Sequence, residues 1–131
     1  MKKLILISSL ALFIGTTGSA YADCSANTRV TGNTLTTLIT GNTICATQGN
    51  DKWQEQHRAD GQLWDYKKGP GDTVDPTEQV GTWSITSNTL THSYGSVSYS
   101  YSVHLVSGNS YTLCGPSIIN ATIQAAPSCG F

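Results

Sequence analysis

The sequence has little charge and lacks the motifs that mark common enzymes. Only 11% of its residues are Asp, Glu, Lys or Arg. It contains no Gly-x-Ser-x-Gly nucleophile elbow, no phosphate-binding loop and no metal-hydrolase motif. No two cysteines have the close C-x-x-C spacing that zinc sites favour. We therefore expect no enzymatic activity, no cofactor and no metal site.

Only one long apolar run is present, at residues 4–15, and it is too short to span a bilayer. Two lysines precede it, and the small-residue cleavage site Ala20-Tyr21-Ala22 follows it. This pattern predicts a cleavable signal peptide over residues 1–22 and a single exported domain over residues 23–131, in the periplasm or outside the cell. Because Asp23 stands where a lipid-acylation signal needs a small residue, we expect no membrane anchor.

Basic residues are also scarce. Without the two lysines of the signal peptide, five basic residues remain against eight acidic ones, a net charge of −3. Nucleic acid and anionic membrane surfaces need a basic stripe, so both are disfavoured as partners.

What the chain does have is Thr, Ser, Asn and Gly, a composition typical of strands and turns. Strands are expected near residues 43–47, 53–58, 62–67, 80–86, 89–94, 97–106, 110–114 and 118–124. A short helical turn is expected at Leu35, Leu38 and Ile39, with Asn33 and Thr34 as caps.

Turn signals at residues 87–88, 95–96 and 107–109 set the register of three consecutive hairpins. The expected cross-strand pairs are Trp83 with His92, Ile85 with Leu90, Leu90 with Tyr101, His92 with Tyr99, Tyr94 with Val97, Val103 with Leu113 and Leu105 with Tyr111. All these side chains share one face, which we expect to be dry, and His104 lies on the opposite, solvated face.

An earlier hairpin is expected to turn at Asp60-Gly61, placing His57 opposite Trp64 and Glu55 opposite Tyr66. The stretch from Lys67 to Val80 contains two prolines and is long for a hairpin connection. It is either a functional loop or a crossover between two halves of a barrel.

Eight antiparallel strands in chain order, with one apolar face, predict an all-β up-and-down barrel; a two-layer sandwich is the alternative. The four cysteines predict two disulfides in an oxidising compartment. Barrel closure favours Cys24 with Cys129 and Cys45 with Cys114. The sequence-local pairing of Cys24 with Cys45 and Cys114 with Cys129 stays open.

Two clusters are candidate sites. His57 and His92 could form a metal or acid-base site, or they could be ordinary core and surface imidazoles. The inward-facing rings could instead line a ligand pocket, or simply fill a small barrel. The residues expected to line such a pocket are Trp83, Leu90, His92, Tyr94, Tyr99, Tyr101 and Tyr111.

Two short segments resemble known families. Gly81-Thr82-Trp83-Ser84-Ile85, followed by Asn88-Thr89-Leu90, resembles the Gly-Thr-Trp, turn and apolar strand of bacterial lipocalin-like barrels, although their Gly-x-Trp lies near the start of the barrel. Ser93-Tyr94-Gly95-Ser96-Val97-Ser98-Tyr99 is similar to a loop of the periplasmic C-type lysozyme inhibitors. The chain also resembles an uncharacterised family of secreted proteobacterial proteins, which implies no activity.

Together these patterns predict an exported, non-enzymatic binding protein that holds a small amphipathic or aromatic ligand in the mouth of a barrel. The alternative is a protein-binding inhibitor, or a cell-envelope interaction protein, that acts through residues 67–80 or the turn at Gly95. An enzyme without a recognisable catalytic motif is the third reading.

Overall fold

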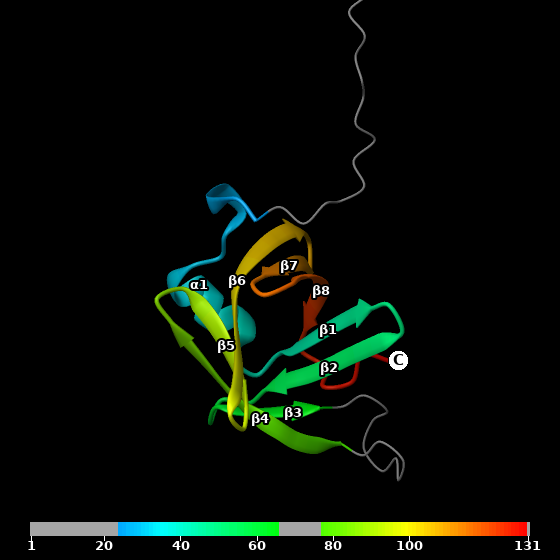
Figure 1. Cartoon of the computed structure of the whole chain (residues 1–131). Helices are drawn as coiled ribbons and strands as arrows, with labels where there is room; N and C mark the ends of the chain where they lie inside the picture. The colour runs from blue at the N-terminus through cyan, green and yellow to red at the C-terminus, as the bar shows by residue number, and fades with distance from the viewer. Residues whose placement is uncertain (1–23, 66–76, 131) are drawn as a thin grey trace, which may run out of the picture.

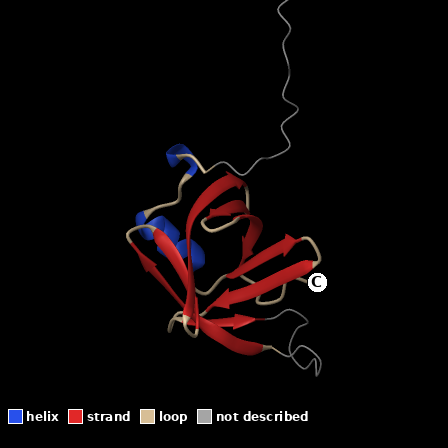
Figure 2. Ribbon diagram, viewed as in Figure 1, coloured by secondary structure: helices blue, strands red, loops and turns tan. Residues whose placement is uncertain are grey.

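The chain folds into a closed eight-stranded antiparallel barrel (Figures 1 and 2). The computed structural model describes residues 24–65 and 77–130. The predicted signal peptide, Tyr66 and most of the loop after it lie outside the described residues. The strands are β1 (Thr43–Gln48), β2 (Asp51–His57), β3 (Gln62–Asp65), β4 (Glu78–Thr86), β5 (Thr89–Tyr94), β6 (Val97–Ser107), β7 (Ser110–Cys114) and β8 (Ile118–Gln124). Pairing of β1 with β8 closes the sheet, which confirms the barrel rather than the sandwich.

The register of the three central hairpins is confirmed at every predicted pair. Trp83 faces His92, Leu90 faces Tyr101, and Val103 faces Leu113. The first turn works because Ser87 and Asn88 both adopt positive φ, 49° and 62°, as a two-residue primed turn requires. Turn residues and the alternation of apolar side chains therefore predict the same strand register from β4 to β7, half of the barrel wall.

The expected dry face is only partly dry. Leu90, Val103 and Leu113 are buried, but Val97 and Tyr99 are 47% and 40% exposed. These two residues lie at the start of β6, next to the β5–β6 turn. The apolar face therefore continues to the rim of the barrel, where its rings meet solvent.

One end of the barrel is filled by the helix α1 (Gly32–Ile39), which follows the 3-10 turn η1 (Ala26–Thr28). Leu35 and Ile39 are fully buried in the main apolar cluster with Val103. The predicted helix is confirmed, but its predicted caps are wrong because it begins earlier. The Asn88 Oδ1 accepts the Gly32 N–H at 2.8 Å, so a hairpin turn caps the helix from outside it (Figure 1).

The predicted register of the β2–β3 hairpin is wrong by one residue. His57 lies opposite Leu63, and Glu55 lies opposite Asp65. Beyond that pair the Arg58 N–H donates to the Gln62 carbonyl, which leaves residues 59–61 to make the turn, and Gly61 adopts φ 87° there. Trp64 consequently lies on the outer side, where the Arg58 guanidinium stacks 3.8 Å from its ring centroid.

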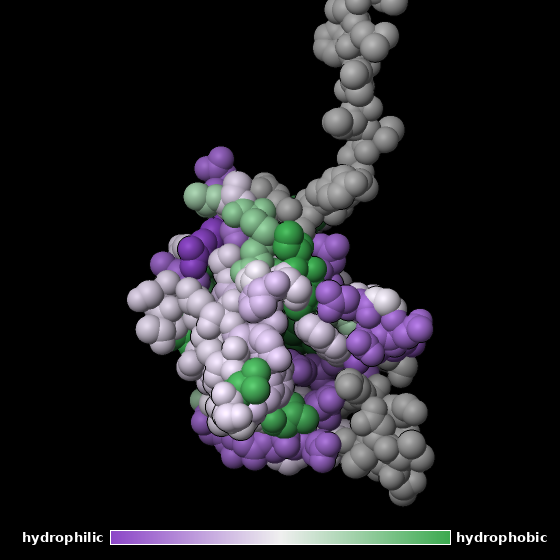
Figure 3. Space-filling model, viewed as in Figure 1, coloured by the Kyte–Doolittle hydropathy of each residue, from purple (hydrophilic) through white to green (hydrophobic). Residues whose placement is uncertain are grey.

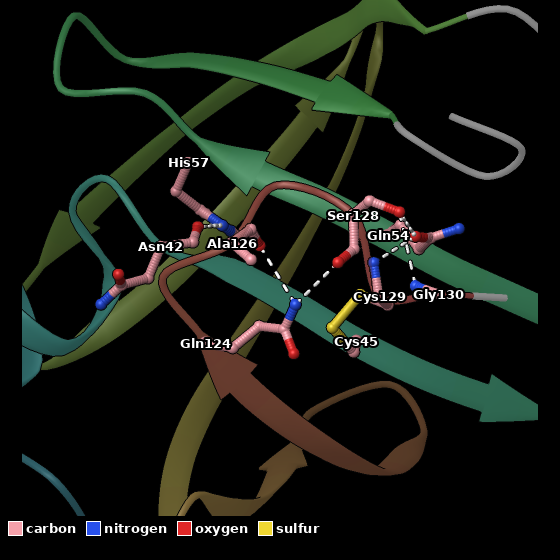
Figure 4. Close-up of a disulfide and its surroundings, with 9 residues drawn as sticks. All are labelled: Asn42, Cys45, Gln54, His57, Gln124, Ala126, Ser128, Cys129 and Gly130. Atoms are coloured by element: carbon pink, nitrogen blue, oxygen red, sulfur yellow. Dashed lines mark hydrogen bonds between the residues drawn. A yellow bond between two sulfur atoms is a disulfide. The ribbon is translucent and has the colours of Figure 1, made fainter. Parts of the chain in front are cut away.

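Both predicted disulfide pairings are wrong; the bridges are Cys24–Cys114 and Cys45–Cys129. Cys45 alternates with the core residues Ile44 and Ala46, so it points outward from the sheet. The chain after Gln124 folds back over the outer face of β1 and β2 to reach it (Figure 4). Strand ends alone could not predict this, because each bridge pins a terminal segment to the barrel's outer wall.

The C-terminal segment also buries a polar side chain of β2. Gln54 is 1% exposed, and its Oε1 accepts hydrogen bonds from the Ser128 hydroxyl at 3.3 Å and from the Cys129 N–H (Figure 4). Gln124 Nε2 donates to the carbonyls of Ala126 and Ser128. This strap is therefore held by hydrogen bonds as well as by a covalent link.

His104 was expected on the solvated face, and it is 2% exposed. The N-terminal segment covers it: Thr28 Oγ1 lies 3.0 Å from its Nδ1, and Ser102 Oγ lies 2.8 Å from its Nε2. Arg29 forms a backbone bridge with the same residue. The imidazole of His104 is thus buried where the N-terminal segment packs against β6.

Outside these contacts the strands carry polar residues, and the face shown in Figure 3 is mostly pale or purple with small apolar patches. No helix among the described residues is both long and apolar enough to cross a membrane. The two disulfides fit an oxidising, extracytoplasmic compartment.

Candidate functional site

A cavity of about 400 Å³ lies at the end of the barrel opposite α1. It is bounded by the last residue of β1, the middle of β2, the end of β5, the first half of β6 and the connection between β7 and β8. Its lining residues are Gln48, Trp53, Glu55, His92, Tyr94, Tyr99, Tyr101, Pro116 and Ser117. A volume of this size is typical of a pocket for a small organic molecule.

Alternation along the strands places these side chains inside. Trp53, Glu55 and His57 occupy every second position of β2, so they point to the same side of the sheet. His92 and Tyr94 do the same on β5, with Tyr99 and Tyr101 on β6 completing the set. The mouth is therefore aromatic, and its described lining residues include a single carboxylate, that of Glu55.

The carboxylate of Glu55 is held by the tyrosine across the mouth. The Tyr94 hydroxyl donates to Glu55 Oε1 at 2.7 Å, and Glu55 Oε2 lies 3.4 Å from His92 Nδ1. The Glu55 side chain is only 15% exposed. A hydrogen bond between a hydroxyl and a carboxylate is a strong one, and it fixes the orientation of both side chains.

Beneath the mouth, two imidazoles lead inward to the helix. His57 Nε2 lies 2.8 Å from His92 Nε2, and His57 Nδ1 lies 3.2 Å from the Asn42 carbonyl oxygen. A carbonyl can only accept, so His57 Nδ1 carries a hydrogen and its Nε2 accepts from His92. This order of donors makes His92 Nδ1 an acceptor whenever both rings are neutral.

Burial keeps both imidazoles neutral. Loss of hydration lowers the pKa of His57 to about 4, against the smaller opposing effects of its hydrogen bonds to the backbone carbonyls of Asn42 and Glu55. The pKa of His92 falls to about 3, first through burial and then through the neighbouring His57. The nearby Glu55 carboxylate acts in the opposite sense, but two imidazoles in nitrogen-to-nitrogen contact cannot both take up protons.

The pKa values of two tyrosines in the mouth are raised by burial and by the negative charge of Glu55. Burial raises the pKa of Tyr94, and the charge of Glu55 raises it further. The pKa of Tyr101 is raised by the same two causes in the same order. Both phenols therefore remain protonated at neutral pH and serve as hydroxyl donors.

Four of the seven side chains predicted to line a pocket do so: His92, Tyr94, Tyr99 and Tyr101. The other three, Trp83, Leu90 and Tyr111, are not among its lining residues. Leu90 lies in the filled part of the barrel, where Trp83 and Tyr111 pack against the buried cluster. The aromatic face is thus divided between a core and a mouth.

Trp53 and Glu55 were not predicted to lie in the site. β2 reads Asp-Lys-Trp-Gln-Glu-Gln-His, with polar residues on both sides, so hydrophobic alternation does not reveal its inner face. The spacing of Trp53, Glu55 and His57 at every second position was the available signal. The Pro116-Ser117 connection carries no such pattern.

No protein-family model matches the chain, and neither the curated proteins nor the solved structures include a match to it. The resemblances to lipocalin-like barrels and lysozyme inhibitors stay predictions. Function must therefore be argued from the residues of the mouth themselves.

The structure does bring His57 and His92 together, as the metal or acid-base hypothesis requires. Both are buried, and among the described residues no group of three or more Cys, His, Asp or Glu side chains is placed to hold a metal ion. An acid-base role would need substrate contact, which only His92 could make because His57 is not among the lining residues.

Two hollows of about 520 Å³ lie elsewhere on the described surface. One runs over β1, β7 and β8 and the other lies between α1 and Leu105. Neither is lined by an Asp, Glu, Lys, Arg or His side chain. The mouth of the barrel, in contrast, combines aromatic rings with a carboxylate and an imidazole.

Proposed function

We propose that this chain is an exported, non-enzymatic binding protein, periplasmic or secreted, that holds a small aromatic or amphipathic molecule in the mouth of its barrel. The cavity beside Glu55, His92 and the tyrosines is the observation that carries the proposal. Aromatic walls with a few fixed polar groups are the usual composition of small-molecule sites.

The division of the barrel supports this function. At the other end, Leu35 and Ile39 are fully buried in the main apolar cluster, so the space at the mouth is not a general property of this barrel. Tyr99 is 40% exposed although its ring faces inward. An inward ring left partly open to water gains contact area when a flat apolar ligand covers it.

The test is a titration of the oxidised protein with three phenyl compounds, 2-phenylethylamine, 2-phenylethanol and phenylacetate, followed by tryptophan fluorescence and by thermal shift. At least one compound is expected to bind saturably and to raise the melting temperature, because ligands that bind only the native state stabilise it. Tyr99→Ala removes one wall and is expected to weaken this binding about tenfold or more.

Val97→Ala is the matched control, since Val97 is equally exposed in the same strand but does not line the cavity. It is expected to leave binding unchanged. Absence of saturable binding by all three compounds contradicts the proposal, as does equal loss in both variants.

A second candidate function is inhibition of another protein through the turn at Gly95. Exposed Val97 and Tyr99 flank this turn, and side chains of this kind anchor protein interfaces. In that case the chain inhibits a lysozyme, Val97→Ser abolishes the inhibition, and the phenyl compounds do not bind. Residues 67–76, the other expected contact, lie outside the described residues.

A further inference from the structure

We infer that the mouth of the barrel selects an organic ammonium ion, specifically an amine carried on a small aromatic or apolar group. This inference rests on the proposed binding function and specifies its ligand class. The geometry points to it through three features of the same cavity: one carboxylate, a set of ring faces, and an imidazole whose outer nitrogen accepts.

The first feature is the charge of the lining. Among the lining residues that the structure describes, Glu55 is the only acidic one and none is Lys or Arg. Its carboxylate is 15% exposed, oriented by the Tyr94 hydroxyl at 2.7 Å and placed 3.4 Å from His92. A fixed, largely buried carboxylate attracts a cation far more strongly than one in bulk water and repels an anion.

The second feature is the set of rings around that carboxylate. Trp53, Tyr94, Tyr99 and Tyr101 all line the cavity, and the rings of Tyr94 and Tyr99 have centroids 6.0 Å apart. The faces of such rings carry negative electrostatic potential and attract ammonium groups, most strongly when water is excluded. The same rings offer apolar surface to the remainder of the ligand.

The third feature is the direction of the hydrogen bonds beneath the mouth. The chain of donors that begins at His57 Nδ1 and the Asn42 carbonyl makes the outer Nδ1 of His92 an acceptor. The Tyr94 hydroxyl has one hydrogen, and its shorter contact is to Glu55, at 2.7 Å against 3.4 Å to His92. A ligand N–H therefore meets acceptors at both Glu55 and His92.

These features together discriminate against the other ligand classes. A carboxylate or phosphate ligand would face Glu55 and the lone pair of His92, with no described cationic side chain in the lining to compensate. A neutral alcohol keeps one hydroxyl donor but loses the charge and the ring attraction. The order of affinity follows as amine, then alcohol, then acid.

The test compares 2-phenylethylamine, 2-phenylethanol and phenylacetate, which share a ring and a chain length, by calorimetric titration of the oxidised protein near pH 7. The amine is expected to bind at least about tenfold more tightly than the alcohol, because a charge-assisted contact replaces a neutral one. Phenylacetate is expected to bind most weakly.

Glu55→Gln removes the charge and keeps an acceptor for Tyr94. It is expected to abolish the preference for the amine while changing the affinity for 2-phenylethanol by less than about twofold. Glu78→Gln is the matched control: it removes the same charge from an exposed position outside the cavity and is expected to preserve the preference.

The outcomes separate the two proposals. Equal or tighter binding of the alcohol or the acid by the wild-type protein overturns the inference and leaves the binding function standing. A preference that survives in a folded Glu55→Gln variant also overturns it. Failure of all three compounds to bind removes the binding function and the inference together, and wild-type selectivity decides the matter if Glu55→Gln does not fold.

Discussion

The two ends of this barrel are built from the same alternating strands, yet one is filled and the other is hollow. At the closed end α1 brings Leu35 and Ile39 against Val103, and all three are fully buried. At the open end the corresponding positions carry Glu55, His92 and tyrosines around a cavity of about 400 Å³.

The difference shows that alternation decides which side chains point inward, while their chemistry decides whether the interior packs. Aliphatic side chains interlock at high density and exclude space. Rings tethered by hydrogen bonds to a carboxylate cannot collapse without breaking those bonds, because a buried polar group that loses its partner is costly. The contrast therefore predicts that stability resides at one end and binding at the other.

The largest test of this contrast is a pair of truncations. Leu35→Ala at the closed end is expected to lower the free energy of unfolding by about 2 to 5 kcal/mol, the usual cost of a cavity in a packed core. Tyr99→Ala at the open end is expected to cost less than about 1 kcal/mol, because that ring is already partly in water. Urea denaturation near pH 7 measures both, and equal losses would remove the distinction between the ends.

Acid tests the imidazole pair that separates the two ends. Below pH 6.5 the two histidines become protonated in the unfolded chain but stay neutral in the folded protein, because folding lowers the pKa of His57 to about 4 and that of His92 to about 3. Above pH 6.5 the imidazoles are neutral in both the folded and the unfolded chain, so they do not change the free energy of unfolding. As the pH falls from 6.5 towards 4, the free energy of unfolding decreases. We expect a loss of about 1.4 kcal/mol per pH unit for each imidazole in this window.

Denaturation near pH 7, 6 and 5 measures this loss. The charges and hydroxyl that face the pair, Glu55 and Tyr94, stay in place in a His92→Gln variant. That variant is expected to be less stable near pH 7 but to show a shallower decline, and a flat wild-type profile between pH 7 and 5 would contradict the lowered pKa values.

The smallest test concerns the polar framework of the mouth. Tyr94→Phe removes the hydroxyl that donates to Glu55 and is expected to lower the free energy of unfolding by about 1 kcal/mol. Tyr99→Phe is the comparison, with an expected change of a few tenths of a kcal/mol at a partly exposed ring. Thermal unfolding of the two variants measures this; a larger loss in Tyr99→Phe would show that Tyr94 does not hold the mouth open.

Much of the wall could be predicted from the sequence because the information is local. A turn such as Ser87-Asn88 fixes its own φ angles, and the alternating residues on either side then have only one register that puts apolar side chains together. All eight strands and three hairpin registers follow from this rule. The predicted β2–β3 register was wrong because β2 has polar residues on both faces, so no alternation of apolar side chains distinguishes one register from another.

The cysteine pairs, the burial of His104 and half of the mouth could not be predicted for a different reason. Each depends on where an irregular segment runs across the finished barrel: the N-terminal segment over His104, the C-terminal strap over Gln54, and the Pro116-Ser117 connection beside the cavity. These paths are set by contacts between residues distant in sequence. The alternation of residues within the strands therefore does not predict the paths of these segments.

The double role of Asn88 implies an order of assembly. Its side chain receives the Gly32 N–H and its carbonyl receives the Arg29 guanidinium, so the segment that plugs the barrel docks onto the turn between β4 and β5. That turn joins adjacent strands and needs little chain entropy to form, whereas the plug must return from about sixty residues away. We expect the β4–β5 hairpin to form early in refolding and to provide the surface onto which the N-terminal helix docks. A change that disrupts the turn is therefore expected to slow refolding more than it lowers the stability of the native state.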